Sequence, residues 1–244
     1  MHVVLLTAKG GNQSIADKNL IAVGGRSMVG HMIHAARGAE RVARVFVSTE
    51  CPRIAECAVG EGAEVIARPA ELARPDTNHG DVIIHGAKAI AEKIGAAPET
   101  VTVLLGNTVM TRAEDIDRAI DAVAAHPEAD SAMTVWLAQD DHPYRAMRIG
   151  SDGYLHAFLE RPGPTDTNRQ SYPPVHFYDQ GPWTVRYSTL LAAPERRDGP
   201  ACWWWMGARC LPLPRLWVTG KDVHTQLDVE ISRAWLENEL WRIQ

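Results

Sequence analysis

Short apolar runs alternate with longer amphipathic segments over the first two thirds of the chain. The runs have strand length and are rich in β-branched residues, whereas the amphipathic segments repeat their apolar residues at helical spacing. The predicted strands are residues 3–6, 45–48, 65–67, 101–105 and 132–137. The predicted helices are residues 28–37, 53–59, 81–94 and 113–125. This alternation predicts an α/β fold with a mainly parallel sheet flanked by helices.

Some helix starts carry signals of their own. Pro52 suits the first turn of the second helix, and Thr111 and Glu114 have the spacing of a capping box at the fourth. The same spacing recurs at Thr225 and Asp228, at the start of a closing helix predicted for residues 226–241. Returning strands are predicted at residues 183–187 and 216–219.

Between about residues 139 and 186 the alternation breaks down. A hairpin is predicted around Asp152 and Gly153, and the segment after it is rich in proline, glycine and polar residues. We interpret residues 139–186 as an arm that projects from a single domain of residues 1–244. Three consecutive tryptophans, residues 203–205, are predicted to pack in the core or against a partner, because a strand would offer only two of them to one base pocket.

The composition excludes several classes of protein. With 244 residues, 45% hydrophobic content, a formal net charge of -5 and a pI near 6.1, the chain has no general attraction to nucleic acid. No leader peptide and no long apolar run are visible, so we expect a cytoplasmic protein without a membrane partner. The spacing of Cys51, Cys57, Cys202 and Cys210 fits neither a zinc knuckle nor a disulfide scaffold, so they are interpreted as reduced structural thiols.

The first predicted strand leads directly into a polar loop, residues 8–19. The loop contains Gly10 and Gly11, which permit close backbone approach, the side chains of Asn12, Gln13 and Ser14, and the cations Lys9 and Lys18. Loops at the carboxyl ends of strands bind ligands in open α/β sheets, and this one is equipped to bind phosphates. It matches neither a P-loop nor a dinucleotide fingerprint, so on composition alone an ordinary solvated loop remains an equal alternative.

Six stretches, in order and at fitting separations, resemble the cytidylyltransferases of the CMP-sialic acid synthetase family over essentially the whole chain. They are "AKGGNQSIADKNL", "RPAELARPDT", "TRAEDIDRAI", "DHPYRAMRIGSDGYL", "NRQSYPPV" and "KDVHTQLDVEISRAWL". The resemblance implies a Rossmann-like nucleotidyltransferase fold, a homodimer formed through the arm, and transfer of CMP from CTP to a small anionic acceptor with release of pyrophosphate.

The resemblance also assigns residues to the nucleotide. Lys9 stands at the family's arginine position and Gln13 at a lysine position, whereas Lys18 and Asn19 match. It implies that Lys9 and Lys18 act on the triphosphate, that Asn19 lies near the nucleotide, and that Arg68 takes the family's arginine role. The nucleotide-binding residues expected from the loop and the resemblance together are Ala8, Lys9, Gly10, Gly11, Asn12, Lys18, Asn19 and Arg68.

The C-terminal motif implies a metal ion. The family's D-x-D-T pattern, found at a strand end just before the last helix, corresponds here to residues 222–225, and strand alternation would place 222 and 224 on one face. Asp222 is therefore the expected ligand of Mg²⁺, which balances charge as pyrophosphate leaves. His224 replaces the second aspartate. Since imidazole suits Mg²⁺ poorly, we expect His224 to contact a phosphate, the acceptor or a metal-bound water, or simply to cap the last helix. The residues expected to act in catalysis are Lys9, Lys18 and Asp222.

A second departure, at Gly106 and Asn107, bears on the acceptor. Neither residue matches the family's sugar-holding or metal-holding patterns, so Asn107 is a candidate acceptor contact or a turn residue. Both departures favour a small phosphonate over a nonulosonic (sialic-type) acid, because a phosphonate oxygen is ionised near neutral pH, by analogy with phosphate, and needs no general base.

Basic side chains of the arm are further candidates for the acceptor site. Arg145, Arg148 and Arg169 suit an oxyanion, and in the family such residues reach across the dimer; ordinary solvated arm charges are the alternative. Two rival functions remain, a nucleotide-binding protein without catalysis and a nucleotidyltransferase for another base.

Overall fold

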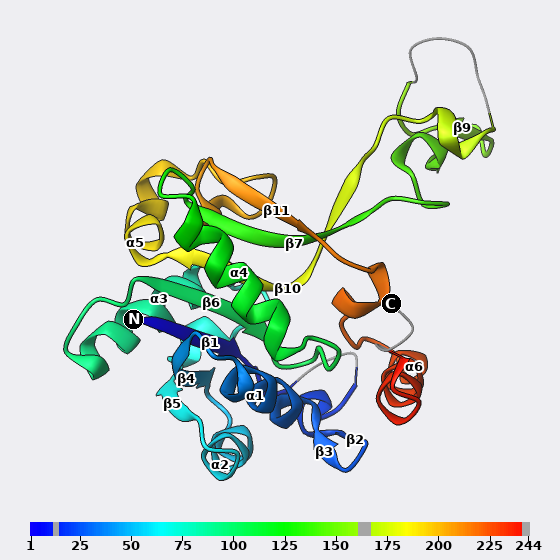
Figure 1. The fold of residues 1–244 in the computed structure, drawn as a ribbon. Helices are drawn as coiled ribbons and strands as arrows, with labels where there is room; N and C mark the ends of the chain where they lie inside the picture. The colour runs from blue at the N-terminus through cyan, green and yellow to red at the C-terminus, as the bar shows by residue number, and fades with distance from the viewer. Residues whose placement is uncertain (12–14, 161–166, 241–244) are drawn as a thin grey trace.

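The computed structural model describes residues 1–11, 15–160 and 167–240. Within these residues, seven strands form one sheet in the order β11-β7-β10-β6-β1-β4-β5 (Figure 1). All neighbouring pairs are parallel except the two that involve β10. The seven strands are β1 (His2–Thr7), β4 (Val42–Thr49), β5 (Glu64–Ala67), β6 (Thr100–Leu105), β7 (Ser131–Leu137), β10 (His176–Arg186) and β11 (Cys210–Pro214).

Helices cover both faces of this sheet, as the alternation of strands and helices predicts. Along β1, Val3 and Leu5 pack with α3 and α5, whereas Val4 and Leu6 pack with α1, α2 and α4, because successive strand side chains point to opposite faces. A third cluster lies beneath α6. The helices are α1 (Met28–Gly38), α2 (Pro52–Gly60), α3 (His79–Ile94), α4 (Ala113–Ala125), α5 (Tyr187–Arg196) and α6 (Gln226–Glu237).

The predicted helix starts are confirmed for α2, α4 and α6, but the capping residues of α4 are shifted by one position. Thr225 caps α6, and the Asp228 side chain accepts a hydrogen bond from the Thr225 backbone N–H. At α4 the N-cap is Arg112 rather than Thr111, and Asp115 rather than Glu114 accepts the bond from the backbone N–H of the cap.

One strand prediction near the C-terminus is wrong, and one strand there was not predicted. The segment predicted as a strand at residues 216–219 forms a 3₁₀ turn, η6 (Trp217–Gly220), and the strand lies earlier, at β11. The two prolines of β11 argued against a strand in the sequence analysis. Proline is nevertheless tolerated in an edge strand, and within the described sheet β11 pairs with β7 alone. Sequence analysis also missed α5.

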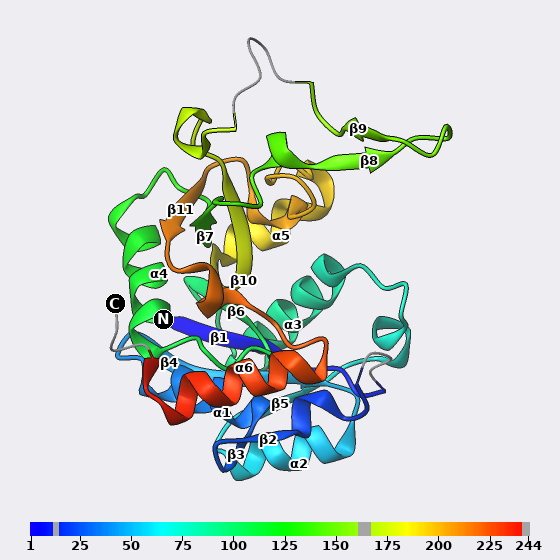
Figure 2. The same ribbon diagram turned by 90° about the vertical axis from the view of Figure 1, so that its right-hand side faces the viewer.

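The arm is shorter than the predicted residues 139–186. β10 begins at His176 and continues past an irregularity between Tyr178 and Trp183, so its first half belongs to the sheet despite its glycine and proline. The described residues of the arm are therefore 138–160 and 167–175. Figure 2 shows its predicted hairpin, β8 (Met147–Ile149) with β9 (Leu155–Ala157), projecting away from the sheet.

Smaller elements complete the fold. β2 (Ala22–Val23) and β3 (Arg26–Ser27) form a short hairpin before α1. The tryptophan run lies around η5 (Trp204–Met206), where Trp204 and Trp205 are buried in the cluster beside α3, as core packing predicts. The remaining 3₁₀ turns are η1 (Lys18–Leu20), η2 (Ala70–Ala73), η3 (Pro143–Arg145) and η4 (Arg169–Ser171). Across the described parts of the chain, no helix has the length and apolar character needed to cross a bilayer.

Candidate active site

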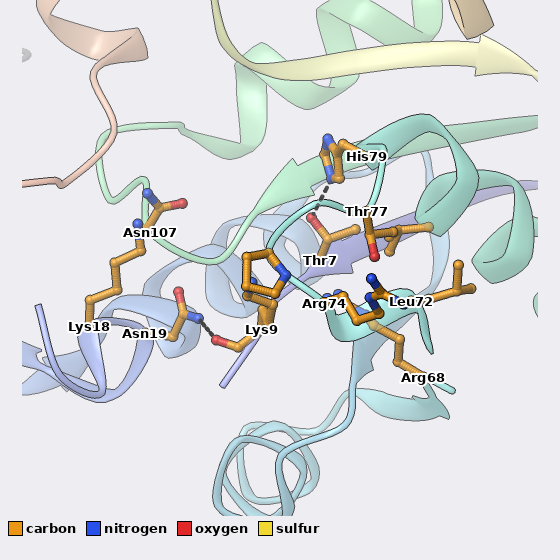
Figure 3. A pocket seen from close by; sticks show the side chains of 12 residues that line it. Thr7, Lys9, Lys18, Asn19, Arg68, Leu72, Arg74, Thr77, His79 and Asn107 are labelled. Carbon is orange, nitrogen blue, oxygen red and sulfur yellow. Dashed lines mark hydrogen bonds between the residues drawn. The ribbon is translucent and has the colours of Figure 1, made fainter. Parts of the chain in front are cut away.

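A cavity of about 200 Å³ opens at the carboxyl ends of β1, β5 and β6, beside the start of α3 (Figure 3). Ligands of open α/β sheets bind at this edge because the loops that follow the strands gather there. The lining residues are Thr7, Lys9, Lys18, Asn19, Arg68, Leu72, Arg74, Pro75, Thr77, His79, Val82 and Asn107. Five residues expected from sequence therefore line one cavity: Lys9, Lys18, Asn19, Arg68 and Asn107.

The start of the first loop is held in shape by two hydrogen bonds. The Gly10 N–H donates to Glu50 Oε1 at 2.7 Å, and Asn19 Nδ2 donates to the Lys9 carbonyl at 2.8 Å. The backbone of Gly10 runs so close to β4 that a Cβ there would lie 2.9 Å from Cys51 Cβ. The close backbone approach predicted for Gly10 is thus an approach to Cys51. The hydrogen bond from Asn19 fixes the backbone of Lys9, so Asn19 holds the part of the loop that carries the Lys9 side chain.

The rest of that loop is described only in part. Ala8 is buried beneath the cavity edge, and Gly11 has a positive φ of 60°, which favours glycine. Asn12, and Gln13 with it, lies outside the described residues.

Lys18 lies near Asp222 at one end of the cavity. Lys18 Nζ donates to the carbonyl of Val223 at 3.4 Å, although the two residues are 205 positions apart in the chain. Burial lowers the pKa of Lys18 below its ordinary value, the Asp222 charge opposes this shift, and the Lys9 charge adds to it. The two side chains are thus close enough for their charges to interact, although Lys18 is among the residues that line the cavity and Asp222 is not.

Asn107 connects the end of β6 to the same corner. Its Nδ2 lies 3.3 Å from Asp222 Oδ2 and 3.4 Å from the Val223 carbonyl. Gly106, just before it, is required by packing, because a Cβ there would lie 2.9 Å from Ala8 Cβ and 3.1 Å from Asn19 Oδ1. The departure from the family at Gly106 therefore lets the loop after β6 close on the first loop.

His224 contacts Asp222 directly. His224 Nε2 lies 2.7 Å from Asp222 Oδ2, while 58% of the imidazole side chain is exposed. The prediction that Asp222 lies at a strand end is wrong, since residues 221–225 form a loop between η6 and α6. The loop nevertheless places positions 222 and 224 on the same side.

Arg68 reaches the cavity wall from an anchored position. Its side chain is 4% exposed, Nη2 donates to the Ser48 carbonyl at 2.7 Å and Nε to Ser48 Oγ at 3.2 Å. Nη1 faces Glu50 at 3.8 Å. Because these contacts fix the guanidinium against β4, Arg68 supplies positive charge at the wall and has little freedom to follow a ligand.

Sequence analysis missed the far end of the cavity. Arg74, Thr77 and His79 line it together with the apolar Leu72 and Val82 (Figure 3). Arg74 lies in the quoted stretch "RPAELARPDT", so its charge was a visible signal. The sequence contained no comparable signal for His79, because only the fold brings its Nε2 within 3.0 Å of Thr7 Oγ1.

His79 makes stability depend on pH. Its pKa is lowered from 6.5 to about 4, first by burial and then by the Arg68 charge. The unfolded chain therefore binds a proton below pH 6.5 that the folded chain does not bind until about pH 4, so acid favours unfolding. We expect the free energy of unfolding to fall by up to about 1.4 kcal/mol per pH unit in this window.

Urea denaturation of the wild type and of His79→Gln between pH 7 and pH 4 measures this effect. The variant should lose part of the pH slope, whereas His34→Gln, at an exposed histidine of α1, should keep it. Equal slopes for the wild type and His79→Gln would contradict the assignment.

Two of the three arm arginines, Arg145 and Arg148, are not among the residues that line the cavity. Arg145 lies in η3, where Nη1 bonds Asp140 Oδ1 at 3.0 Å. Arg148 lies on the exposed strand β8. Arg169 lies in η4, and its side chain is outside the described part of the structure.

Known proteins resemble this chain in sequence and in fold. Residues 3–146 match the family described as Cytidylyltransferase. A 3-deoxy-manno-octulosonate cytidylyltransferase of Rhodopseudomonas palustris is 32% identical over 132 residues, which cover 54% of this chain and 51% of that protein. The Bifunctional protein GlmU of Mycobacterium bovis is 29% identical over 176 residues, which cover 69% of this chain but only 34% of that protein.

Among solved structures, a CMP:2-keto-3-deoxy-manno-octonic acid synthetase complexed with CTP superposes with a TM-score of 0.71. The superposition covers 98% of this chain and 99% of the other, at 19% sequence identity. The likeness confirms the α/β fold with a mainly parallel sheet.

Proposed function

Because this chain belongs to the cytidylyltransferase family, we propose that it transfers CMP from CTP to a small anionic acceptor and releases pyrophosphate. The single observation that carries the proposal is the approach of Lys18, from the first loop, to the loop before α6, where its Nζ donates to the Val223 carbonyl and its charge interacts with that of Asp222. Lysine charge next to a carboxylate that can hold a metal ion is what a triphosphate requires.

The polarity of the cavity gives the nucleotide a direction. Figure 3 shows Lys18 and Asn107 at one end, Lys9 in the middle, and His79 with Thr77 and Leu72 at the other. The first end suits phosphates. The second end combines the neutral His79 imidazole and apolar walls, which suit the face of a base, with Arg74, whose donors suit its polar edge. CTP would thus lie with its phosphates toward Asp222.

In the proposed reaction an acceptor oxygen attacks the α-phosphorus. The bond from that phosphorus to the bridging oxygen breaks, and pyrophosphate leaves with the electron pair. Lys9 and Lys18 stabilise the charge that develops on the phosphate oxygens. A divalent ion such as Mg²⁺, held by Asp222, would neutralise further charge; the carboxylate fits Mg²⁺, whereas the adjacent imidazole does not.

The acceptor we favour is a small phosphonate. Where the resembled family has two carboxylates, this chain has Asp222 and His224, so a dianionic nucleophile meets less repulsion. A phosphonate oxygen is already ionised near pH 7, by analogy with the second phosphate pKa of about 6. Sequence similarity to a 3-deoxy-manno-octulosonate cytidylyltransferase supports a second candidate, a keto sugar acid such as that sugar or a sialic-type acid.

The arm supports a homodimer as part of this proposal. Large apolar side chains of the hairpin are exposed, among them Met147, Ile149 and Leu155. A second copy would cover them and would place Arg145 or Arg169 near the acceptor of the neighbouring chain.

Incubation with CTP, a divalent ion and each acceptor class, followed by pyrophosphate measurement, tests the function. We expect turnover with small phosphonates and slower or no turnover with sugar acids. Turnover with sugar acids alone would reject the phosphonate acceptor. CTP binding without pyrophosphate release across the acceptor panel would favour a non-catalytic nucleotide-binding protein. In thermal-shift measurements, stronger stabilisation by UTP, ATP or GTP than by CTP would reject cytosine as the base.

A further inference from the structure

Asp222 and His224 form a close acid–imidazole pair in the loop before α6. Their donor atoms, Asp222 Oδ2 and His224 Nε2, are 2.7 Å apart. Two ligands at about 2.1 Å from a metal ion and at right angles to each other are roughly 3 Å apart. The pair is therefore close to the spacing of two adjacent positions in an octahedral coordination shell.

Surrounding contacts hold both side chains toward that point. Asn107 Nδ2 donates to Asp222 Oδ2 at 3.3 Å. The backbone N–H of His224 donates to Asp228 Oδ2 at 3.0 Å, which fixes residue 224 to the start of α6. Second partners of this kind orient metal ligands and are worth about 10–100-fold in affinity.

The nearest other carboxylate, Asp228, is already engaged. It accepts hydrogen bonds from the backbone of His224 and Thr225 and from the Thr225 hydroxyl, and it pairs with Lys221 Nζ at 3.0 Å. Asp228 therefore serves the helix cap and does not replace the missing second aspartate. Nowhere in the described chain do three or more His, Cys, Asp or Glu side chains gather as a complete metal site.

We propose that Asp222 and His224 together bind a first-row transition metal ion, Mn²⁺ or Co²⁺, in preference to Mg²⁺, and that phosphate oxygens of the nucleotide complete its shell. Imidazole nitrogen binds such ions well, whereas Mg²⁺ demands oxygen ligands and keeps its waters. The inference rests on the proposed function, because two protein ligands hold an ion tightly only when the triphosphate is present.

Pulsed electron paramagnetic resonance of Mn²⁺ detects a directly bonded nitrogen, and provides a test that does not depend on turnover. The sample is the full chain with Mn²⁺ and the α,β-methylene analogue of CTP. The wild type should show ¹⁴N coupling that free Mn²⁺ with the analogue lacks. The coupling should vanish in His224→Asp and His224→Asn, and it should persist in His156→Asn, a histidine of the arm that pairs with Asp152.

Competition between the ions gives a second measurement. Titration of Mg²⁺ against bound Mn²⁺ should show that His224→Asp, which restores two carboxylates, lowers the preference for Mn²⁺ by about tenfold or more. Because 58% of the His224 side chain is exposed, both variants should keep the wild-type circular dichroism spectrum.

The outcomes separate this inference from the proposed function. Calorimetry that detects no binding of the analogue with either ion would overturn both. Binding of the analogue with Mn²⁺ but without ¹⁴N coupling, or with an unchanged ion preference in His224→Asp, would overturn the metal assignment and leave the cytidylyltransferase proposal standing.

Discussion

Replacing Lys18 by methionine is expected to lower kcat/KM for pyrophosphate release from CTP by about 10²–10³-fold, the usual cost of removing one donor from developing charge. The half-buried amino group feels the charges of both Asp222 and Lys9, and burial away from water already lowers its pKa. Charge interactions are stronger where water is excluded. The loss should therefore fall mainly on kcat, with a smaller effect on CTP affinity.

Pyrophosphate release measured over a range of CTP concentrations separates the two parameters. Lys88→Met, which removes the same charge from an exposed position of α3, is the matched control and should stay within about twofold of the wild type. A kcat/KM of Lys18→Met within threefold of the wild-type value would show that Lys18 is not a catalytic residue.

Replacing Arg215 by methionine is expected to cost about 3–5 kcal/mol in the free energy of unfolding, because it leaves a buried carboxylate without its counter-ion. The Arg215 side chain is 5% exposed and that of Asp179 is 1% exposed. Arg215 donates to both Asp179 oxygens and to the Gly181 carbonyl, and Thr134 also donates to Asp179. The ion pair thus ties β10 to the chain that follows β11.

Urea denaturation, followed by circular dichroism, measures this loss. Arg41→Met removes an ion pair whose members are 54% and 52% exposed. Because solvent screens this pair, its removal should lower the free energy of unfolding far less than Arg215→Met does. Adding Asp179→Leu to Arg215→Met should recover part of the stability, since no orphaned charge remains. Equal costs at Arg215 and Arg41 would show that water reaches the Arg215–Asp179 pair.

Most of the fold could be predicted because the spacing of apolar residues in each segment matches the strand or helix that the segment forms. Each of the first five predicted strands and the first four predicted helices is present, with ends shifted by a few residues at most. The errors lie where tertiary contacts override composition: β11 is a strand in spite of two prolines, and β10 extends into a segment whose proline and glycine predicted a loop.

The cavity could be predicted only in part, and the reason is similar. Lys9, Lys18 and Asp222 belong to motifs that a single sequence can display. His79 and Thr7 come together only because the start of α3 lies over the end of β1, and the attachment of Arg68 to β4 depends on strands that are distant in sequence. The pairing of His224 with Asp222 could not be predicted, because residues 221–225 were expected to follow a strand and instead form a loop.

The contact between Lys18 and Val223 joins positions from the two extremes of the chain. The residues that line the cavity all lie between positions 7 and 107, so the loop before α6 acts on the cavity through its bonds to Lys18 and Asn107. Cleavage of the chain before this loop is therefore expected to leave the lining residues in place and to remove the Val223 carbonyl to which both side chains donate. The Lys18 end of the cavity would then lose the partner that holds it.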